Sequence, residues 1–257
     1  MSRHIPRKRF GQHFLTDPDI ISTIVRAIRP RAGEHLVEIG PGLGALTIPL
    51  LEQIEQMTVI ELDRDIVTRL QKRFPPERLT IHAGDALAFD FASLPGPLRV
   101  VGNLPYNIST PLLFHLAAFA GHITDIHVML QKEVVDRMTA RSGTPDYGRL
   151  SVMLQYRFDM ELLLDVPPDA FDPPPKVDSA VVRMTPRSAS EQSLCDAGHL
   201  EQLVASAFSQ RRKTLRNTLG QQISPEGFAS LGIDSGRRAE TLELADFIRM
   251  TNYLHPQ

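Results

Sequence analysis

The chain has 257 residues, of which 42% are hydrophobic and 23% are charged, and its formal net charge is -2. This composition is typical of one large globular domain, or of a large domain with a small companion, and it excludes a disordered or a collagen-like chain. Because the net charge is close to zero, a polyanionic partner must be held by local basic clusters. The single cysteine, Cys195, excludes an internal disulfide and a cysteine-rich metal site, which fits a reducing compartment.

The first nine residues contain four basic side chains, but no apolar stretch of signal-peptide length follows them. No window approaches the roughly 20 apolar residues that a membrane-spanning helix needs. We therefore expect a cytoplasmic protein. A short basic transit peptide is the alternative that the sequence leaves open.

Short apolar runs alternate with longer amphipathic segments over the first half of the chain. The runs predict strands at residues 35–39, 57–61, 79–82, 99–103 and 126–131. Segments 45–53, 64–74 and 110–119 have apolar residues three and four positions apart, which indicates helices that lie on a sheet. The alternation predicts an α/β fold with a doubly wound, mostly parallel sheet, in which ligands bind beyond the carboxyl ends of the strands.

The second half of the chain begins with a predicted helix at 148–158 and two strands at 161–166 and 178–184. The strands are joined by 11 residues that include five prolines, so we expect no regular structure between them and an antiparallel arrangement of the two. Residues 188–193 are polar and predict a linker. Helical segments around 199–220 and 239–254 follow without a strand signal. The predicted domains are 1–187, with a seven-stranded sheet, and 188–257, which is small and all helical.

Three glycines, Gly40, Gly42 and Gly44, alternate with other residues directly after the first predicted parallel strand and open a helix. Glycine permits positive φ and lets a ligand approach the backbone. The third glycine comes one residue too early for the dinucleotide-binding pattern, so a nicotinamide-dependent dehydrogenase is disfavoured. A tight turn without a ligand is the other interpretation.

Two carboxylates stand at the ends of the next strands. Glu61 ends one strand, where its oxygens can accept hydrogen bonds from both hydroxyls of a ribose. Asp85 follows another strand, where it can accept from an adenine amino group or, alternatively, cap a helix. The glycine turn with these two acids resembles the S-adenosyl-L-methionine site of class I methyltransferases.

The tetrapeptide Asn103, Leu104, Pro105 and Tyr106 follows the fourth strand. An exocyclic amine on an aromatic base is a poor nucleophile until hydrogen-bond acceptors draw it toward tetrahedral geometry. The Asn103 side-chain oxygen and the Leu104 carbonyl are candidate acceptors, because the proline biases Leu104 toward an extended conformation. Tyr106 can stack on the base, which is worth roughly 1–3 kcal/mol. The competing interpretation is an ordinary turn with a core tyrosine.

The chain resembles the small-subunit ribosomal RNA adenine-N6 dimethyltransferases from residue 7 to about residue 250. The motifs that carry the resemblance are RKRFGQHFLTD, EIGPGLGALT, IELD, GDAL, NLPYNIST, FDPPPKVDSAVV and FSQRRKTLRNTL, in this order. The most specific are NLPY, the run that begins at Phe171, and RRKTLRN. The resemblance implies a Rossmann-like class I methyltransferase that dimethylates two adjacent adenosines in the hairpin loop near the 3′ end of 16S rRNA, late in the biogenesis of the 30S subunit.

The resemblance also implies roles for individual residues. The cofactor contacts fall on Gln12, His13, Leu15, Gly40, Gly42, Gly44, Glu61, Asp85 and Asn103. The residues that handle the base are Asn103, Leu104, Tyr106 and Phe171. Phe171 has the alternative role of anchoring the proline-rich loop. His13 stands where asparagine is common in the family. A cofactor contact through a side-chain amide is therefore not expected here, whereas a contact through the backbone of residue 13 is.

Two basic clusters are candidates for RNA binding, and neither has acidic neighbours in the sequence. They consist of Arg7, Lys8 and Arg9, and of Arg211, Arg212, Lys213 and Arg216. The default explanation for such a cluster is a solvated helix face. If the clusters bind single-stranded RNA, each neutralised phosphate adds about 0.7 to the slope of log affinity against log salt concentration.

We expect the flipped adenine amine to displace the methyl group of S-adenosyl-L-methionine directly, without a metal, since the nine histidines show no ligand spacing. The expected partner is small-subunit rRNA within an immature 30S particle, and the expected state is a monomer. Two rival functions stay open. One is a methyltransferase that acts on a large-subunit adenosine, and the other is an RNA-binding assembly factor that does not need catalysis.

Overall fold

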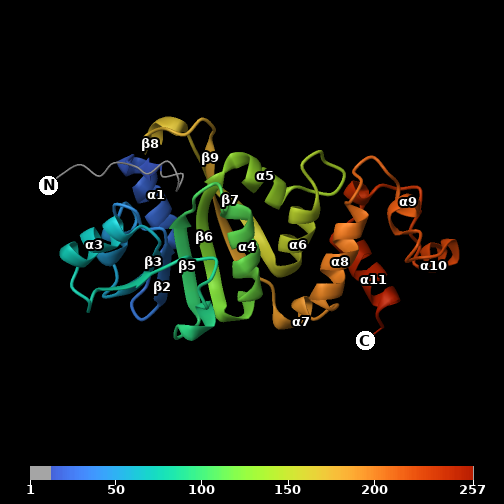
Figure 1. Cartoon of the computed structure of the whole chain (residues 1–257), viewed down its shortest axis with the longest axis horizontal. Helices are drawn as coiled ribbons and strands as arrows, with labels where there is room; N and C mark the ends of the chain where they lie inside the picture. The colour runs from blue at the N-terminus through green and yellow to red at the C-terminus, as the bar shows by residue number, and fades with distance from the viewer. Residues whose placement is uncertain (1–12, 257) are drawn as a thin grey trace. The chain divides into compact units, whose positions relative to one another are not determined.

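The computed structural model describes residues 13–256, and Figure 1 shows the course of the chain. The chain divides into two compact units. One comprises the chain up to Val135 together with residues 160–186, and the other comprises residues 136–159 together with the chain from Arg187 onward. Within residues 13–256, no helix has both the length and the apolar character that crossing a bilayer requires.

A seven-stranded sheet with the order β4-β3-β2-β5-β6-β9-β7 forms the first unit. The strands are β2 (His35–Ile39), β3 (Met57–Glu61), β4 (Leu79–Ala83), β5 (Leu98–Asn103), β6 (Ile123–Gln131), β7 (Phe158–Val166) and β9 (Ser179–Pro186). The five strands from β4 to β6 pair in parallel. The chain runs outward from β2 to β4 and then returns to β5 on the other side of β2. Such a reversal opens a crevice beyond the carboxyl ends of β2 and β5, the strands that precede Gly40 and end at Asn103.

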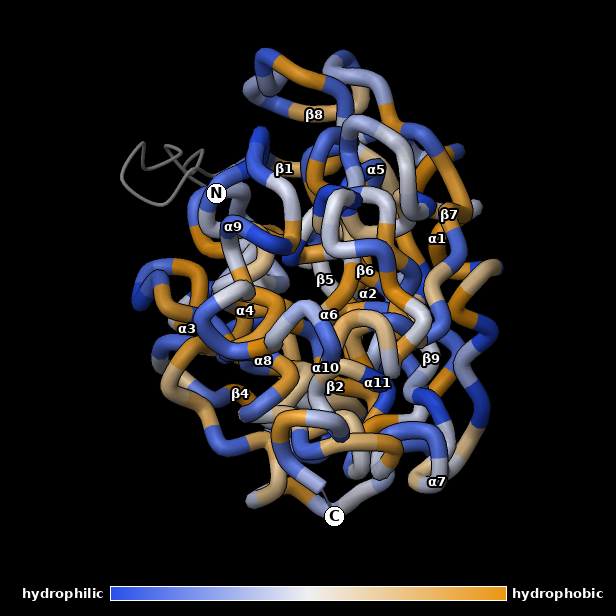
Figure 2. Tube along the Cα trace, turned by 90° about the vertical axis from the view of Figure 1, so that its right-hand side faces the viewer, coloured by the Kyte–Doolittle hydropathy of each residue, from blue (hydrophilic) through white to orange (hydrophobic). Residues whose placement is uncertain are grey.

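Burial explains why these segments are strands. The central strands β2 and β5 are buried at nearly every position, as a parallel sheet that is covered on both faces requires. Figure 2 shows hydrophobic residues along β5 and β6 in the interior of this unit. All seven predicted strands are confirmed, and their ends differ from the prediction by at most three residues.

Helices α1 (Pro18–Ile28), α2 (Thr47–Leu51), α3 (Arg64–Arg73), α4 (Ser109–Ala118) and α5 (Lys132–Thr139) connect or follow the strands. The sequence analysis did not predict α1 or α5. The signals for α1 were present, because the Asp17 side chain accepts hydrogen bonds from the N–H groups of Asp19 and Ile20. Short 3-10 turns, η2 (Phe91–Ser93) and η3 (Ala120–His122), precede β5 and β6.

The antiparallel end of the sheet agrees with the prediction. Strand β9 pairs antiparallel with β6, and β7 lies beside β9 at the edge. The side chain of Arg183 on β9 pairs with that of Glu161 on β7, while the Arg187 N–H donates to the Arg157 carbonyl. Since the residue numbers rise along one strand as they fall along the other, β7 and β9 run in opposite directions.

The expectation of no regular structure between these two strands was wrong. The connection contains a 3-10 turn, η4 (Pro168–Ala170), and a short strand, β8 (Phe171–Asp172), which pairs antiparallel with β1 (Phe14–Leu15). Prolines flank β8 but do not occupy it, so both of its residues keep the N–H groups that a strand needs. We call the paired segments 13–17 and 170–173 the strap.

The second unit is helical. Its helices are α6 (Arg149–Arg157), α7 (Ala189–Gln192), α8 (Ala197–Ala207), α9 (Leu215–Leu219), α10 (Pro225–Ser230), the 3-10 turn η5 (Ala239–Thr241) and α11 (Leu244–Leu254). Helix α6 packs against α8 and α11. Residues 136–159, which the sequence analysis assigned to the first domain, therefore belong to the helical unit. The predicted linker at 188–193 contains α7, which Ser188 and Glu191 cap reciprocally. The helix expected around 199–220 is interrupted between α8 and α9.

Candidate active site

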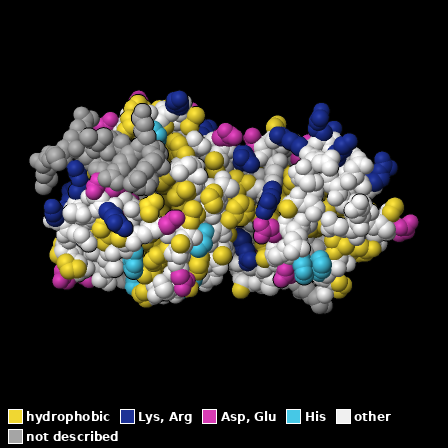
Figure 3. Space-filling model, viewed as in Figure 1, with side chains coloured by type: hydrophobic (Ala, Val, Ile, Leu, Met, Phe, Trp, Pro, Cys, Tyr) yellow, Lys and Arg dark blue, Asp and Glu magenta, His cyan; other side chains and the backbone are white. Residues whose placement is uncertain are grey.

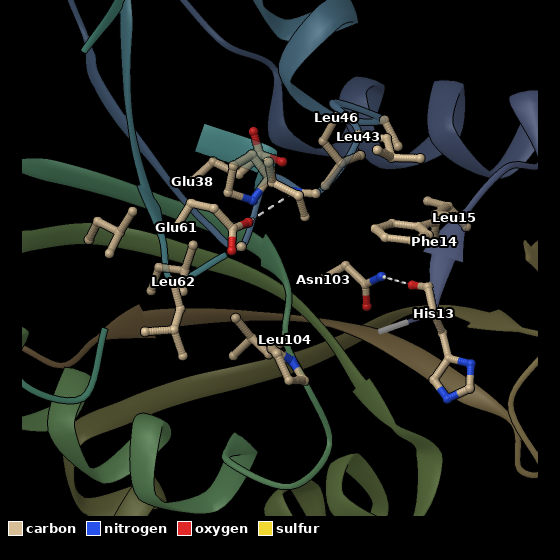
Figure 4. Close-up of a pocket in the computed structure, with 18 of the residues that line it drawn as sticks. His13, Phe14, Leu15, Glu38, Leu43, Leu46, Glu61, Leu62, Asn103 and Leu104 are labelled. Atoms are coloured by element: carbon tan, nitrogen blue, oxygen red, sulfur yellow. Dashed lines mark hydrogen bonds between the residues drawn. The ribbon is translucent and has the colours of Figure 1, made fainter. Parts of the chain in front are cut away.

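A cavity of about 390 Å³ lies beyond the carboxyl ends of β2, β3, β4 and β5, where the reversal of the chain opens the sheet. Figure 4 shows that Glu61 and Asn103 reach this space from different strands, and that the segment from His13 to Leu15 forms another side of it. The predicted site residues that line the cavity are His13, Leu15, Gly40, Gly42, Glu61, Asp85, Asn103, Leu104 and Tyr106. Gln12 lies outside the described residues.

The glycine turn has the backbone that its sequence predicted. Gly40, Gly42 and Gly44 have φ values of +67°, +54° and +91°, a region that other residues rarely adopt. A Cβ on Gly42 would lie 3.2 Å from two ring carbons of Phe14. Gly44 does not line the cavity, and its role is to form the turn before α2. The backbone of Gly40 and Gly42 therefore reaches the cavity wall, where a bulky ligand can contact it directly.

Glu61 is fixed at the end of β3 by two backbone groups. Its carboxylate accepts hydrogen bonds from the N–H of Asp63 at 2.8 Å and from the N–H of Gly42 at 3.4 Å. Burial raises the pKa of Glu61, while these N–H donors lower it. The bond to Gly42 ties the acid to the glycine turn, so both parts of the predicted ribose site are held together.

The sequence analysis did not assign Glu38 to the site, although this side chain also lines the cavity. It is 2% exposed and accepts a hydrogen bond of 2.6 Å from the Thr47 hydroxyl. The pKa of Glu38 is raised to about 7, because burial and, to a smaller extent, the neighbouring Glu61 carboxylate raise it by more than the hydrogen bond from Thr47 lowers it. The available signal was an acid inside a buried strand, two residues before the first glycine.

Asp85 lies in a turn after β4, and no helix follows it there, so it does not cap a helix. Its Oδ1 accepts a hydrogen bond of 2.9 Å from the N–H of Leu87 within this turn. The residue is exposed and also lines the cavity. The turn occupies one carboxylate oxygen, and no described residue from 13 to 256 bonds to the other.

Asn103 and Leu104, the two predicted acceptor residues, both line the cavity. The Asn103 side-chain nitrogen donates to the carbonyl of His13 at 3.0 Å, and Figure 4 shows this bond to the His13 side, with Leu104 on the other side of Asn103. A carbonyl only accepts, so this bond assigns the nitrogen to His13 and leaves the side-chain oxygen as an acceptor. The Leu104 N–H donates to Met129 at 3.1 Å, and within residues 13–256 no donor bonds to the Leu104 carbonyl.

Tyr106 is half-buried and is held at both its hydroxyl and its ring. The hydroxyl lies 2.6 Å from the Ser179 hydroxyl, and the ring stacks on that of His13 with centroids 5.8 Å apart and an angle of 25° between planes. Burial raises the pKa of Tyr106. The tyrosine is therefore at the cavity as the sequence predicted, in a fixed orientation.

Phe171, like Gly44, is a predicted site residue that does not line the cavity. Its side chain is 3% exposed, belongs to the hydrophobic core that also contains Leu15, and does not line the cavity. Strand β8 pairs Phe171 with Leu15, so the aromatic ring anchors the strap. This placement favours the anchoring interpretation over stacking on a base.

The predicted basic cluster of the second unit lies just before and within α9. Figure 3 shows Lys and Arg side chains gathered over this segment, and Arg211, Arg212, Lys213 and Arg216 are all exposed. Sequence reasoning missed two further arginines, Arg237 and Arg238, which a backbone bridge from Thr214 to Arg238 brings beside the cluster. It also missed an acidic neighbour, because Glu240 lies 3.6 Å from Arg211 and 3.9 Å from Arg238. Arg7, Lys8 and Arg9 lie outside the described residues.

A parallel sheet that opens at its reversal point, with a glycine turn and an acid at the end of the next strand, is the arrangement by which Rossmann-like methyltransferases bind S-adenosyl-L-methionine. The backbone of Gly40 and Gly42 at the cavity wall, together with the Glu61 carboxylate, fits this cofactor. The protein is of this class. Among residues 13–256, no group of three or more His, Cys, Asp or Glu side chains is placed to hold a metal ion.

Comparisons with known proteins give the family. The model of the ribosomal RNA adenine dimethylase family matches residues 3–256. The chain is 64% identical to the ribosomal RNA small subunit methyltransferase A of Thiobacillus denitrificans, with 98% of both chains covered. It is 63% identical to the protein of the same name from Laribacter hongkongensis, over 98% of this chain and 97% of that one. The chain belongs to the ribosomal RNA adenine dimethylase family.

Solved structures agree with this assignment. A dimethyladenosine transferase from Plasmodium falciparum is similar with a TM-score of 0.81 and 26% identity, and 93% of this chain and 96% of that chain are covered. The 23S rRNA methyltransferase ErmE is similar with a TM-score of 0.72 and 25% identity, over 94% of this chain and 99% of that chain. The predicted fold class, a Rossmann-like methyltransferase, is confirmed.

Proposed function

We propose that the protein transfers methyl groups from S-adenosyl-L-methionine to N6 of two adjacent adenosines in the 3′-terminal hairpin loop of 16S rRNA. The membership of the adenine dimethylase family and the names of the similar small-subunit enzymes support this proposal. The observation that carries it is the pair of acceptors at Asn103 and Leu104, which lie at the same cavity as the glycine turn.

The acceptors act on the electronic structure of the amine. In adenine the amine lone pair is delocalised into the ring, and two acceptors for its N–H groups favour the tetrahedral geometry that frees the lone pair. The Asn103 oxygen and the Leu104 carbonyl supply acceptors that need no reorganisation, because the Asn103 nitrogen is held by His13. The bound cofactor supplies a methyl group on a positively charged sulfur. Positioning and exclusion of water then provide the main rate enhancement.

The remaining residues hold the two substrates. The Gly40 and Gly42 backbone and the Glu61 carboxylate bind the cofactor, and Asp85 accepts a hydrogen bond from its adenine. Tyr106 stacks on the flipped base, which offsets the few kcal/mol that unstacking the nucleotide costs. Arg211, Arg212, Lys213 and Arg216 contact RNA phosphates, and the second cluster at Arg7, Lys8 and Arg9 does the same.

We further propose that the partner is small-subunit rRNA within an immature 30S particle, late in its assembly, and that the enzyme works as a monomer in the cytoplasm without a metal. Binding of RNA through local clusters is supported by the distribution of charge, because a chain with a net charge of -2 has no global positive field to attract a polyanion. Direct transfer to the amine has no step that a metal must assist.

The test is to incubate the protein with labelled S-adenosyl-L-methionine and immature 30S particles and to map N6,N6-dimethyladenosine. The proposal expects label at two adjacent adenosines of the 3′-terminal hairpin and none on particles that already carry the modification. Label only on large-subunit rRNA would support the rival enzyme. Binding to the particle without any transfer would support an assembly factor that needs no catalysis.

A further inference from the structure

His13 connects three segments that meet at the cavity. Its carbonyl accepts the hydrogen bond from Asn103, and its ring nitrogen Nδ1 lies 2.8 Å from the carbonyl of Pro173. Its imidazole stacks on the ring of Tyr106. One residue of the strap thus contacts the acceptor asparagine, the proline-rich loop and the tyrosine of the NLPY segment.

The imidazole is anchored in one orientation. The Pro173 carbonyl can only accept a hydrogen bond, so Nδ1 of His13 carries the proton and donates. The next residues, Phe14 and Leu15, pair with Asp172 and Phe171, which fixes the backbone on which the ring stands. The ring is therefore a fixed wall beside Tyr106 and does not swing freely into the cavity.

The stacking distance decides where a base can lie. Aromatic rings in contact have centroids about 4.5–7 Å apart, so the 5.8 Å between His13 and Tyr106 leaves no space for a third ring between them. The hydrogen bond from Tyr106 to Ser179 holds the opposite end of the tyrosine. One face of the Tyr106 ring is covered, and the ring is held at both ends.

We propose that His13 is a positioning residue for methyl transfer: its imidazole covers one face of Tyr106 and so directs the target adenine to the other face. This inference rests on the proposed function, because it assumes that Tyr106 stacks on the flipped base. His13 acts through Tyr106, and its side chain makes no essential contact with the cofactor. The backbone carbonyl that orients Asn103 is present whatever side chain stands at position 13.

The test compares two variants with the wild type on particles in which 2-aminopurine replaces a target adenosine. The fluorescence of this analogue falls when it stacks on an aromatic ring. His13→Ala uncovers Tyr106 and is expected to reduce the quenching at least about twofold and kcat on unsubstituted particles about tenfold, the change that loss of one stacking contact implies. His13→Phe keeps a ring on Tyr106 and is expected to restore both values to within about threefold of the wild type.

Cofactor affinity, measured by calorimetry, separates positioning from cofactor binding. It is expected to change less than about threefold in both variants, because the His13 carbonyl stays in place. The matched control is His35→Ala. His35 stands at the start of β2, and its imidazole makes a similar hydrogen bond to a proline carbonyl, that of Pro95. This control is expected to leave the quenching and kcat unchanged.

A double-mutant cycle with Tyr106→Ala completes the experiment. If His13 acts through Tyr106, then His13→Ala has no further effect on quenching or kcat once the tyrosine is gone. Additive effects, normal quenching in His13→Ala, or a loss of cofactor affinity that parallels the loss of kcat would each overturn the inference. A wild-type protein that neither quenches the analogue nor methylates the particle would instead refute the proposed function.

Discussion

Within residues 13–256, the side chain of Asn103 makes one hydrogen bond, and this bond decides which of its two polar atoms is available to a substrate. The nitrogen is used by the His13 carbonyl at 3.0 Å, so the oxygen is the atom that can accept from a substrate amine. A substitution here removes the acceptor and also one connection to the strap. We expect the two losses to change different measured quantities. Loss of the acceptor oxygen lowers turnover, and loss of the hydrogen bond to the strap lowers cofactor affinity.

We expect Asn103→Ala to lower turnover by about 100-fold or more, the effect of removing one preorganised polar group from an active site. The glycine turn and Glu61 are unchanged, so cofactor binding remains measurable by calorimetry. Turnover is measured as methyl label incorporated into immature 30S particles. Near-normal incorporation by this variant would remove the proposed role of the Asn103 oxygen.

Glu38 is a second residue whose environment predicts a measurable property. Its pKa of about 7 in the folded protein compares with an ordinary value of 4.5. Because the folded pKa is the higher one, the folded state binds more protons than the unfolded state between these two values. The free energy of unfolding therefore falls as the pH rises through this window, and the stabilisation is complete only below the unfolded pKa.

For Glu38→Gln we expect a weaker fall in stability with rising pH than in the wild type. A shift of this size corresponds to about 3 kcal/mol between pH 4.5 and pH 8, as an order of magnitude. Urea unfolding of both proteins at several pH values measures the difference. Glu61, whose pKa is also raised, contributes in the same direction to both proteins and largely cancels. Parallel curves would show that Glu38 does not titrate in this window.

At the scale of elements, the strap and the glycine turn form adjoining walls of the cavity. Phe14 of β1 lies against Gly42. The two segments of the strap are joined by the N–H groups of Thr16 and Asp17, which donate to the Ala170 carbonyl at 2.8 Å and 3.3 Å. A change in the turn that adds volume must therefore displace the strap as well as strain the backbone.

Substitution of Gly42 by alanine tests this coupling. The φ of +54° costs about 1–2 kcal/mol for a residue with a Cβ, and the new methyl group would lie 3.2 Å from the Phe14 ring. We expect a similar loss of stability and at least about a tenfold loss of cofactor affinity. Gly33→Ala is the matched control, because Gly33 has φ +83° but a Cβ added there would meet no other atom within 4 Å. It should lose stability alone, and equal effects on affinity would contradict the coupling.

Elements whose signals are local were predictable from the sequence. The run that forms β5 ends at Asn103, and the alternating glycines demanded positive φ, so the positions of Asn103 and of the glycine turn were predicted correctly. The strap was not predictable, since a two-residue strand has no periodicity and its pairing joins segments 154 or more residues apart. The burial of Phe171 follows from that pairing, which is why its position could not be inferred from the motif.

At the scale of the whole molecule, contacts that are distant in sequence determine which residues act together. Helix α6 packs with the C-terminal helices although β7 and β9 follow it in the chain, so the helical unit is discontinuous. The single hydroxyl proton of Tyr156, near the end of α6, is shared between the carbonyls of Gln192 and Cys195, which lie 2.6 Å and 2.7 Å away and tie the two segments of this unit. The same folding brings Arg237 and Arg238 to the basic cluster and adds Glu240 as a competing carboxylate.

This charge distribution predicts which basic residues contribute most to RNA binding. Arg211 is paired with Glu240, whereas Arg212 and Lys213 have no carboxylate partner within residues 13–256. Replacing both Arg212 and Lys213 by alanine should weaken binding to 30S particles and reduce the slope of log affinity against log salt by about 1.4, at 0.7 per phosphate on single-stranded RNA. Filter binding at several salt concentrations measures this slope. The control replaces Lys72 and Arg73, an exposed basic pair in the last turn of α3, and should leave the slope unchanged. Equal slopes in all three proteins would show that the cluster is only a solvated surface.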